Sequence, residues 1–224
     1  MCFSTPRPAN CGSGMICARA ILLVGPTGAG KTPLGEYLEA NGLWGRRCAH
    51  FDFGAQLRGI LAGEVGVPEL TKAELEVIEG SLRTGAVLED EQFPIAGKIL
   101  RAFAERRGLG GEDCIVLNGL PRHVGQAKDV DAVLAVEAVI SLECTAEVVY
   151  ERIRLNSAGD RTGRVDDDVA AIARKLEIFT HRTVPLVERY QWSGIPVHRI
   201  TIGVLDTPAM IHQWLSSPRA GPAA

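Results

Sequence analysis

The sequence predicts an α/β fold in which helices cover both faces of a parallel β-sheet, so that the chain forms three layers. Five short apolar runs are the first observation, because strands without polar alternation are typical of parallel sheets covered on both faces. Longer stretches between these runs, with helical character, are the second observation. The length of 224 residues is the third, since it suits one domain with a small appended subdomain.

The apolar runs mark the expected strands, at residues 20–24, 48–53, 114–117, 138–142 and 196–202. Two helices are expected in succession between the second and third strands. Thr71 and Glu74 match a capping box that opens the first helix, which continues through Ile78. Acidic residues at 89–91 favour the start of the second, which runs to about residue 106. The two helices are therefore a candidate small subdomain inserted between the second and third strands.

A loop and a long helix are expected after the fourth strand. Residues 156–164 are polar and contain glycine and arginine, which suits either a surface connection or a flap that closes over phosphate. Apolar residues at spacings of three and four predict a helix from residue 166 to about 190, with a bend at Pro185. Residues 1–14 and 218–224 are expected to be disordered tails of a domain that spans 15–217.

Composition excludes several classes of function. The chain has 24 Lys and Arg against 27 Asp and Glu, a net charge of −3 that lacks the broad positive field needed for nucleic acid. For this reason we expect no nucleic acid as a partner. No apolar run is long enough to span a bilayer, so we expect no membrane as a partner either. The six cysteines are scattered without zinc-site spacing, which fits a reducing compartment. We expect a cytoplasmic monomer.

The most specific signal is the segment GPTGAGKT, which follows the first apolar run directly. It matches the P-loop pattern G-x-x-x-x-G-K-[ST]. In such a loop, backbone N–H groups and the start of the following helix cradle phosphate. Lys31 is expected to reach the terminal phosphates of ATP, and Thr32 is expected to offer its hydroxyl to Mg²⁺. The predicted ATP site consists of Gly25, Gly28, Ala29, Gly30, Lys31 and Thr32.

The remaining motifs resemble those of the adenylate kinases, within the nucleoside monophosphate kinase family. After the P-loop, the chain has FGxxLR at 53–58, GxxL at 85–88, NGLPR at 118–122 followed by Gln126, and RVDD at 164–167. The resemblance covers about residues 19–202. It implies a five-stranded parallel sheet, an acceptor-binding insertion over 54–90 and a short lid over 156–164. It also implies Mg²⁺-dependent transfer of phosphate from ATP to a nucleoside monophosphate, with AMP as the expected acceptor.

The resemblance also implies roles for single residues. Arg58 and Arg122 are similar to the two arginines that hold the acceptor phosphate. The rest of the implied acceptor site consists of Gly85, Leu88, Gly119 and Gln126. Since phosphoryl transfer involves little covalent chemistry, such cations would supply alignment and charge neutralisation.

The implied donor side uses residues from later in the chain. Arg152 is similar to a residue that packs on the donor adenine, and Arg164 resembles a lid arginine that contacts the transferring phosphates. Lys175 stands where the family has a further arginine. Lysine keeps the positive charge but lacks the planar guanidinium group that binds phosphate through two hydrogen bonds. The expected catalytic residues are Lys31, Arg122, Arg164 and Lys175.

Other positions depart from the family pattern. Asn118 replaces an aspartate that organises the water around Mg²⁺, so Thr32 and Asn118 are the expected metal-site residues, with Asp52 as a possible replacement carboxylate. Asn156 replaces an arginine before the lid. Two other functions therefore stay open: a P-loop kinase for another small acceptor, such as a sugar, and a nucleotide-binding sensor with little turnover.

Overall fold

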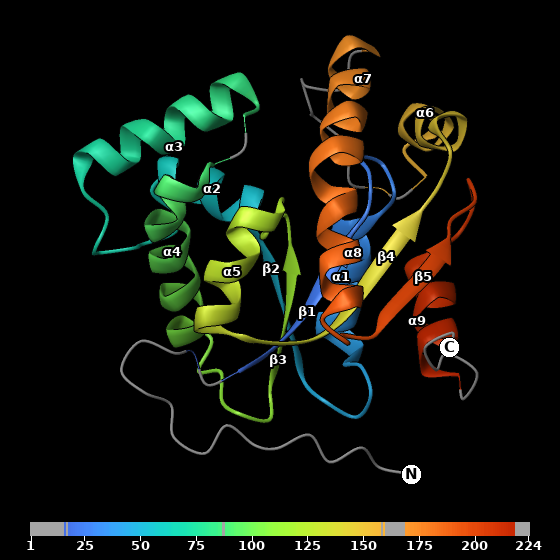
Figure 1. Cartoon of the computed structure of the whole chain (residues 1–224), viewed down its shortest axis with the longest axis horizontal. Helices are drawn as coiled ribbons and strands as arrows, with labels where there is room; N and C mark the ends of the chain where they lie inside the picture. Colours follow the sequence, from blue (N-terminus) through green and yellow to red (C-terminus); the bar gives the residue numbers. More distant parts are fainter. Residues whose placement is uncertain (1–15, 17, 87, 158, 160–168, 218–224) are drawn as a thin grey trace.

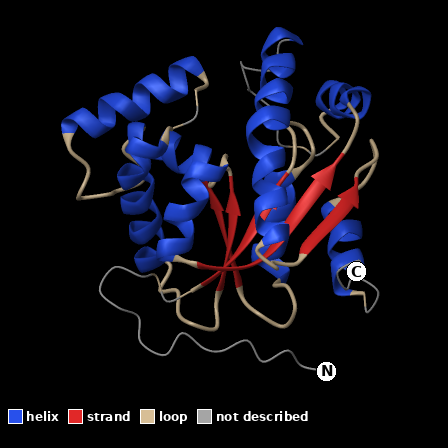
Figure 2. Cartoon of the chain, viewed as in Figure 1, coloured by secondary structure: helices blue, strands red, loops and turns tan. Residues whose placement is uncertain are grey.

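A computed structural model of the chain describes residues 16, 18–86, 88–157, 159 and 169–217 (Figure 1). The expected tails, Arg164 and most of the expected lid loop lie outside these residues. Five parallel strands form one sheet in the order β2-β3-β1-β4-β5 (Figure 2). The strands are β1 (Arg19–Val24), β2 (Cys48–Asp52), β3 (Cys114–Asn118), β4 (Ala135–Glu143) and β5 (Val197–Thr201). The predicted α/β fold is confirmed.

Helices form the two outer layers because successive strand residues face opposite sides. On one face, Ile21 and Leu23 of β1 share a core with α1 and α9. On the other face, Ala20 and Leu22 pack into a core that includes side chains of α2, α4, α5 and α8. The bounds are α1 (Lys31–Asn41), α2 (Phe53–Leu61), α4 (Phe93–Arg106), α5 (Val124–Val133), α8 (Val184–Trp192) and α9 (Pro208–Ser216). None of the described helices is long and apolar enough to cross a membrane.

Among the described residues, three α-helices lie between β2 and β3, where the sequence predicted two. The predicted pair corresponds to α3 (Lys72–Thr84) and α4, and α2 is an additional helix that begins directly after β2. Thr71 and Glu74 form the predicted capping box, since the Thr71 side chain accepts from the Glu74 N–H and Glu74 accepts from the Thr71 N–H. Glu74 also pairs with Lys98 of α4, which fixes the start of α3 against the body of the protein. In Figure 1, α3 stands at the upper left, above the carboxyl ends of the strands.

Two predicted elements differ from the structure. The strand expected over 48–53 ends at Asp52, because the Asp52 side chain accepts from the Ala55 N–H and caps α2. The single helix expected over 166–190 is interrupted: α7 (Val169–Ile178) passes into a π-helical turn (Phe179–Thr183) and then into α8. Pro185 lies in the first turn of α8, and the wider π-helical turn before it accommodates the missing N–H.

The parallel order brings three loops to one edge of the sheet. β1 lies between β3 and β4, and β3 lies between β1 and β2. Asn118 ends β3 beside Asp52 at the end of β2, and it is also in register with Leu23 near the end of β1. The loops that leave β1, β2 and β3 therefore start side by side, as is usual for ligand sites in parallel sheets.

Gly35 sets how closely α1 approaches β2. A Cβ atom at Gly35 would lie 2.2 Å from Cδ2 of His50, whereas a Cβ atom at Gly80 of α3 would meet open space. We expect Gly35→Ala to lower the free energy of unfolding by about 1–3 kcal/mol through overpacking. Gly80→Ala, the matched control, should raise it by about 0.4–1 kcal/mol. Urea unfolding checks both values, and equal midpoints for Gly35→Ala and the wild type would contradict the packing argument.

Candidate active site

A cleft of about 290 Å³ lies at the carboxyl ends of β1, β2 and β3. The P-loop and the strand ends form its floor, while α3 contributes Ser81 and α7 contributes Lys175 to its sides. Figure 1 shows α3 and α7 rising on either side of these strand ends. The sequence-predicted residues that line the cleft are Gly25, Gly28, Gly30, Lys31, Thr32, Arg58, Gly85, Leu88, Asn118, Gly119, Arg122, Gln126 and Lys175.

The P-loop has the conformation that its glycines favour. Gly28 and Gly30 have φ angles of 78° and 90°, in the left-handed region that other residues rarely adopt. Gly30 caps α1, so the positive end of the helix dipole faces the cleft. Lys31 Nζ donates to the carbonyl oxygens of Gly25 and Pro26, each at 2.8 Å, which holds the ammonium across the loop. The side chain of Ala29 is fully buried and does not line the cleft.

Thr32, Asp52 and Asn118 form a polar contact at the strand ends. Thr32 Oγ1 donates to Asp52 Oδ2 at 2.8 Å, and Asn118 Nδ2 donates to the same oxygen at 2.9 Å. Asn118 Nδ2 also lies 3.1 Å from Thr32 Oγ1. The hydroxyl that the P-loop pattern assigns to Mg²⁺ therefore points its hydrogen at a carboxylate.

Two arginines meet in the cleft from different elements. Arg58 comes from α2, and Arg122 comes from the loop after β3. Neither guanidinium forms a hydrogen bond or an ion pair with the described residues. Arg122 reaches water through the open cleft, yet the protein packed around it desolvates its charge and lowers its pKa, and the positive charge of Arg182 lowers that pKa further. These groups make the cleft strongly attractive to an anion.

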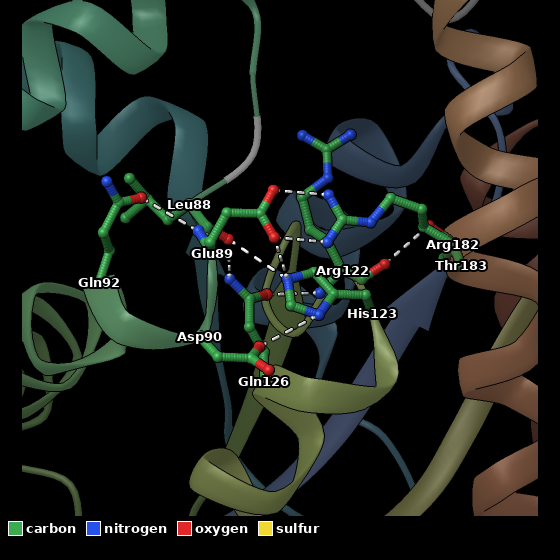
Figure 3. Close-up of polar contacts among 9 residues, drawn as sticks. All are labelled: Leu88, Glu89, Asp90, Gln92, Arg122, His123, Gln126, Arg182 and Thr183. Atoms are coloured by element: carbon green, nitrogen blue, oxygen red, sulfur yellow. Dashed lines mark hydrogen bonds and ion pairs between the residues drawn. The ribbon is translucent and has the colours of Figure 1, made fainter.

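Gln126 joins the two loops of the expected acceptor side (Figure 3). Its Oε1 accepts from the Arg122 N–H at 2.8 Å, and its Nε2 donates to the Leu88 carbonyl at 2.7 Å. The Leu88 side chain is buried in the core, so its carbonyl forms the polar contact. Gly85 ends α3 at the rim of the cleft. Gln126 lines the cleft although it is only 1% exposed, so its amide mainly joins the two loops.

Comparison with known proteins agrees with this geometry. Residues 21–174 match the family model described as an AAA domain. The adenylate kinase of Parvibaculum lavamentivorans is 30% identical over 183 residues, which cover 78% of this chain and 80% of that protein. The adenylate kinase of Synechococcus sp. strain WH7803 is 30% identical over 181 residues, which cover 78% and 86%.

The chain belongs to the adenylate kinase family. It is thus a P-loop kinase, as its motifs indicated. Among solved structures, a gluconokinase from Sinorhizobium meliloti 1021 aligns with a TM-score of 0.49 at 18% identity, over 88% of this chain and 89% of that one.

Sequence reasoning missed two residues of this kinase that adjoin Arg122. Arg182, in the π-helical turn, donates to both carboxylate oxygens of Glu89 at 2.8 and 2.7 Å, and Thr183 Oγ1 donates to the Arg122 carbonyl at 3.0 Å (Figure 3). The hydrogen bond from Arg182 lowers the pKa of Glu89, and the same bond raises the pKa of Arg182. No motif spacing links these residues, because Thr183 and Arg122 are 61 positions apart.

Arg152 occupies a different place from the one expected. Its side chain is only 3% exposed and does not line the cleft. Its guanidinium donates to the Gly28 carbonyl of the P-loop at 3.0 Å. It also donates to the carbonyls of Gly203, Val204 and Asp206, between β5 and α9, at 2.6, 3.2 and 3.2 Å. Arg152 therefore ties the P-loop to the segment after β5.

The residues around the expected lid are only partly described. Lys175 of α7 lines the cleft. Asn156 ends α6 (Ala146–Leu155) with a φ of 45°, a left-handed conformation that asparagine tolerates better than arginine. Asparagine thus suits the backbone conformation at this position.

Arg152 provides a test of this placement. We expect Arg152→Met to lower the free energy of unfolding by about 1–3 kcal/mol, because buried carbonyls lose their donor. Arg154, two positions later, is the matched control, since its side chain is exposed and, among the described residues, pairs only with Glu151 on the same helix. Arg154→Met should change stability by less than about 1 kcal/mol. Denaturant unfolding measures both, and an equally small effect of Arg152→Met would contradict the structural role.

Proposed function

We propose that this kinase transfers the γ-phosphate of ATP to a nucleoside monophosphate, with AMP as the acceptor. The observation that carries the proposal is a pair of guanidinium groups, from Arg58 and Arg122, which line the same cleft as the P-loop lysine. Within the described part of the chain, neither group has a hydrogen-bond or ion-pair partner. A second phosphate-bearing substrate would supply the anion that both groups lack. The names of the relatives support AMP in particular.

The geometry suits phosphoryl transfer between two phosphates. The P-loop N–H groups and Lys31 hold the donor phosphates, and Arg58 and Arg122 hold the acceptor phosphate by bidentate hydrogen bonds. Lys175 faces the cleft from α7 and adds a further positive charge. Because this reaction needs little covalent chemistry from the protein, alignment by these cations and neutralisation of charge in the transition state supply most of the rate.

The residues at the strand ends fit a Mg²⁺ ion shared with nucleotide phosphates. Among the described residues, no group of three or more His, Cys, Asp or Glu side chains could hold a metal by itself. Mg²⁺ fits this arrangement, since it keeps several waters and binds mainly through substrate phosphates and one or two oxygen ligands. Thr32, with Asp52 and Asn118 beside it, would hold the ion. When bound, Mg²⁺ neutralises part of the phosphate charge.

One observation favours a second function, the phosphorylation of a small hydroxyl-bearing acceptor. An alcohol must lose its proton to the enzyme or to solvent during the transfer, and the carboxylate of Asp52 lines the cleft as a base for that step. A phosphate acceptor is already ionised and needs no such base. The two functions therefore differ in what Asp52 does and in which acceptor stimulates turnover.

The deciding experiment is an acceptor panel. The protein is incubated with ATP, Mg²⁺ and each of AMP, CMP, UMP, GMP, dTMP, a sugar and a sugar acid, and ADP formation is followed. We expect AMP to give the largest stimulation. Stimulation by the sugar or sugar acid alone would support the second function, and ATP binding without stimulation by any acceptor would indicate a nucleotide sensor. Lys31→Ala is the inactive control, with Lys128→Ala on the exposed face of α5 as its matched partner.

Arg122 provides a test of the acceptor site. We expect Arg122→Ala to raise the KM for the monophosphate by about 10–100-fold, the value of one charge-assisted hydrogen-bonding group, and to lower kcat through misalignment. The Kd for ATP should stay within about twofold, because the P-loop is intact. Arg83→Ala, on an exposed turn of α3, should leave all three constants unchanged. Unaltered acceptor kinetics for Arg122→Ala would contradict the assignment of this residue to the acceptor phosphate.

A further inference from the structure

We propose that Asp52 supplies the carboxylate of the magnesium site, in place of the aspartate that the family has at position 118. The inference rests on the proposed function, because it concerns the ion that accompanies ATP in that reaction. In this chain the carboxylate stands at the end of β2 and an amide at the end of β3.

The first argument is position. Asp52 and Asn118 are the last residues of their strands and are paired in the parallel register of β2 and β3. Their side chains touch, with 2.9 Å between Asn118 Nδ2 and Asp52 Oδ2. A carboxylate at either strand end therefore reaches nearly the same point beside the Thr32 hydroxyl, which lies 2.8 Å from Asp52 Oδ2.

The second argument is charge. Among the described residues that line the cleft, Asp52 is the only acidic one, and it stands with four cations, Lys31, Arg58, Arg122 and Lys175. The carboxylate forms no ion pair with any of them in the described part of the chain, and its three hydrogen-bond donors are neutral. Desolvation lowers the pKa of Arg122, and the negative charge of Asp52 acts to raise it without forming an ion pair in the described part of the chain. We infer that the same charge can orient the water around a divalent cation.

The third argument is orientation. Asp52 Oδ1 accepts from the Ala55 N–H at 2.9 Å, which fixes the carboxylate as the cap of α2 and turns Oδ2 toward Thr32. Asn118 is 5% exposed and presents its NH₂ group to Asp52 and Thr32, so that side of the amide acts as a donor. Asn118 thus positions the carboxylate and the hydroxyl, while Asp52 supplies the charge.

The side-chain contact between Asp52 and Asn118 also explains why the site has one carboxylate and not two. A second carboxylate at position 118 would lie against Asp52 at hydrogen-bond distance, and two like charges so close cannot both ionise at neutral pH. Exchange of the two residues, in contrast, keeps one charge and one amide at the pair. The pair is therefore expected to tolerate exchange better than the loss of its single charge.

The test measures ATP affinity by calorimetry, without an acceptor, once in Mg²⁺ and once in EDTA. The quantity of interest is the ratio of the Kd in EDTA to the Kd in Mg²⁺. We expect Asp52→Asn to lower this ratio by about 10–100-fold relative to the wild type, the usual cost of losing a residue that orients metal ligands. Since asparagine also caps helices well, α2 should stay folded, which a thermal melt checks.

Two further variants provide controls. The exchanged variant, Asp52→Asn with Asn118→Asp, should restore the ratio to within about threefold of the wild type, because one charge returns to the same point. Glu36→Gln removes a carboxylate one helical turn after Thr32, from an exposed side chain that does not line the cleft, and should leave the ratio unchanged.

The outcomes separate this inference from the proposed function. An unchanged ratio in Asp52→Asn overturns the inference. Equal losses of affinity in Mg²⁺ and in EDTA also overturn it, because they indicate a structural role. A large loss of turnover with an unchanged ratio overturns it as well, in favour of a base for a hydroxyl acceptor. The proposed function fails separately, if the wild type binds ATP and shows no stimulation by any nucleoside monophosphate.

Discussion

The parallel pairing of β1, β2 and β3 is the constraint on which the candidate site depends. Because the three strands run in the same direction and end at the same edge, the P-loop, the cap of α2 and the loop after β3 leave the sheet side by side. Thr32, Asp52 and Asn118 then meet within hydrogen-bond distance although Thr32 and Asn118 are 86 positions apart. The rest of the cleft is assembled around this edge by the helices that cover the sheet.

The cleft attracts anions because it contains cations without partners among the described residues, and such cations cost free energy in the folded protein when they are desolvated. Desolvated cations without partners are unfavourable in a folded protein unless a ligand neutralises them. The charge of Arg122 is desolvated in this way, while Arg58 is exposed, and neither has a partner among the described residues. Arg182, close to Arg122, is instead paired with Glu89. The contrast distinguishes a cation paired within the fold from cations left open to an anion, and it is the physical argument behind the proposal of a phosphate-bearing acceptor.

A second network links the two sides of the cleft. Gln126 connects the Leu88 carbonyl to the backbone of Arg122, and Thr183 binds the Arg122 carbonyl from the π-helical turn. Arg182, from the same turn, reaches Glu89 next to Leu88. The backbone that carries Arg122 is therefore held from the segment after α3 and from the turn that follows α7. This support fixes the arginine in place before any ligand arrives, which reduces the entropy lost on binding.

The α/β fold, the approximate strand positions and the P-loop could be predicted from the sequence, because apolar runs, helical periodicity and motif spacing are local properties of the chain. The two arginines of the cleft were implied by the resemblance to a known family. The contacts between distant segments became visible only in the folded chain. In the folded protein, Arg182 lies beside Arg122, and the amide of Asn118 donates to the carboxylate of Asp52. Arg152 links the P-loop to the segment after β5 by hydrogen bonds. Such contacts depend on which strands pair and how helices pack over them, and spacing along the chain does not encode them.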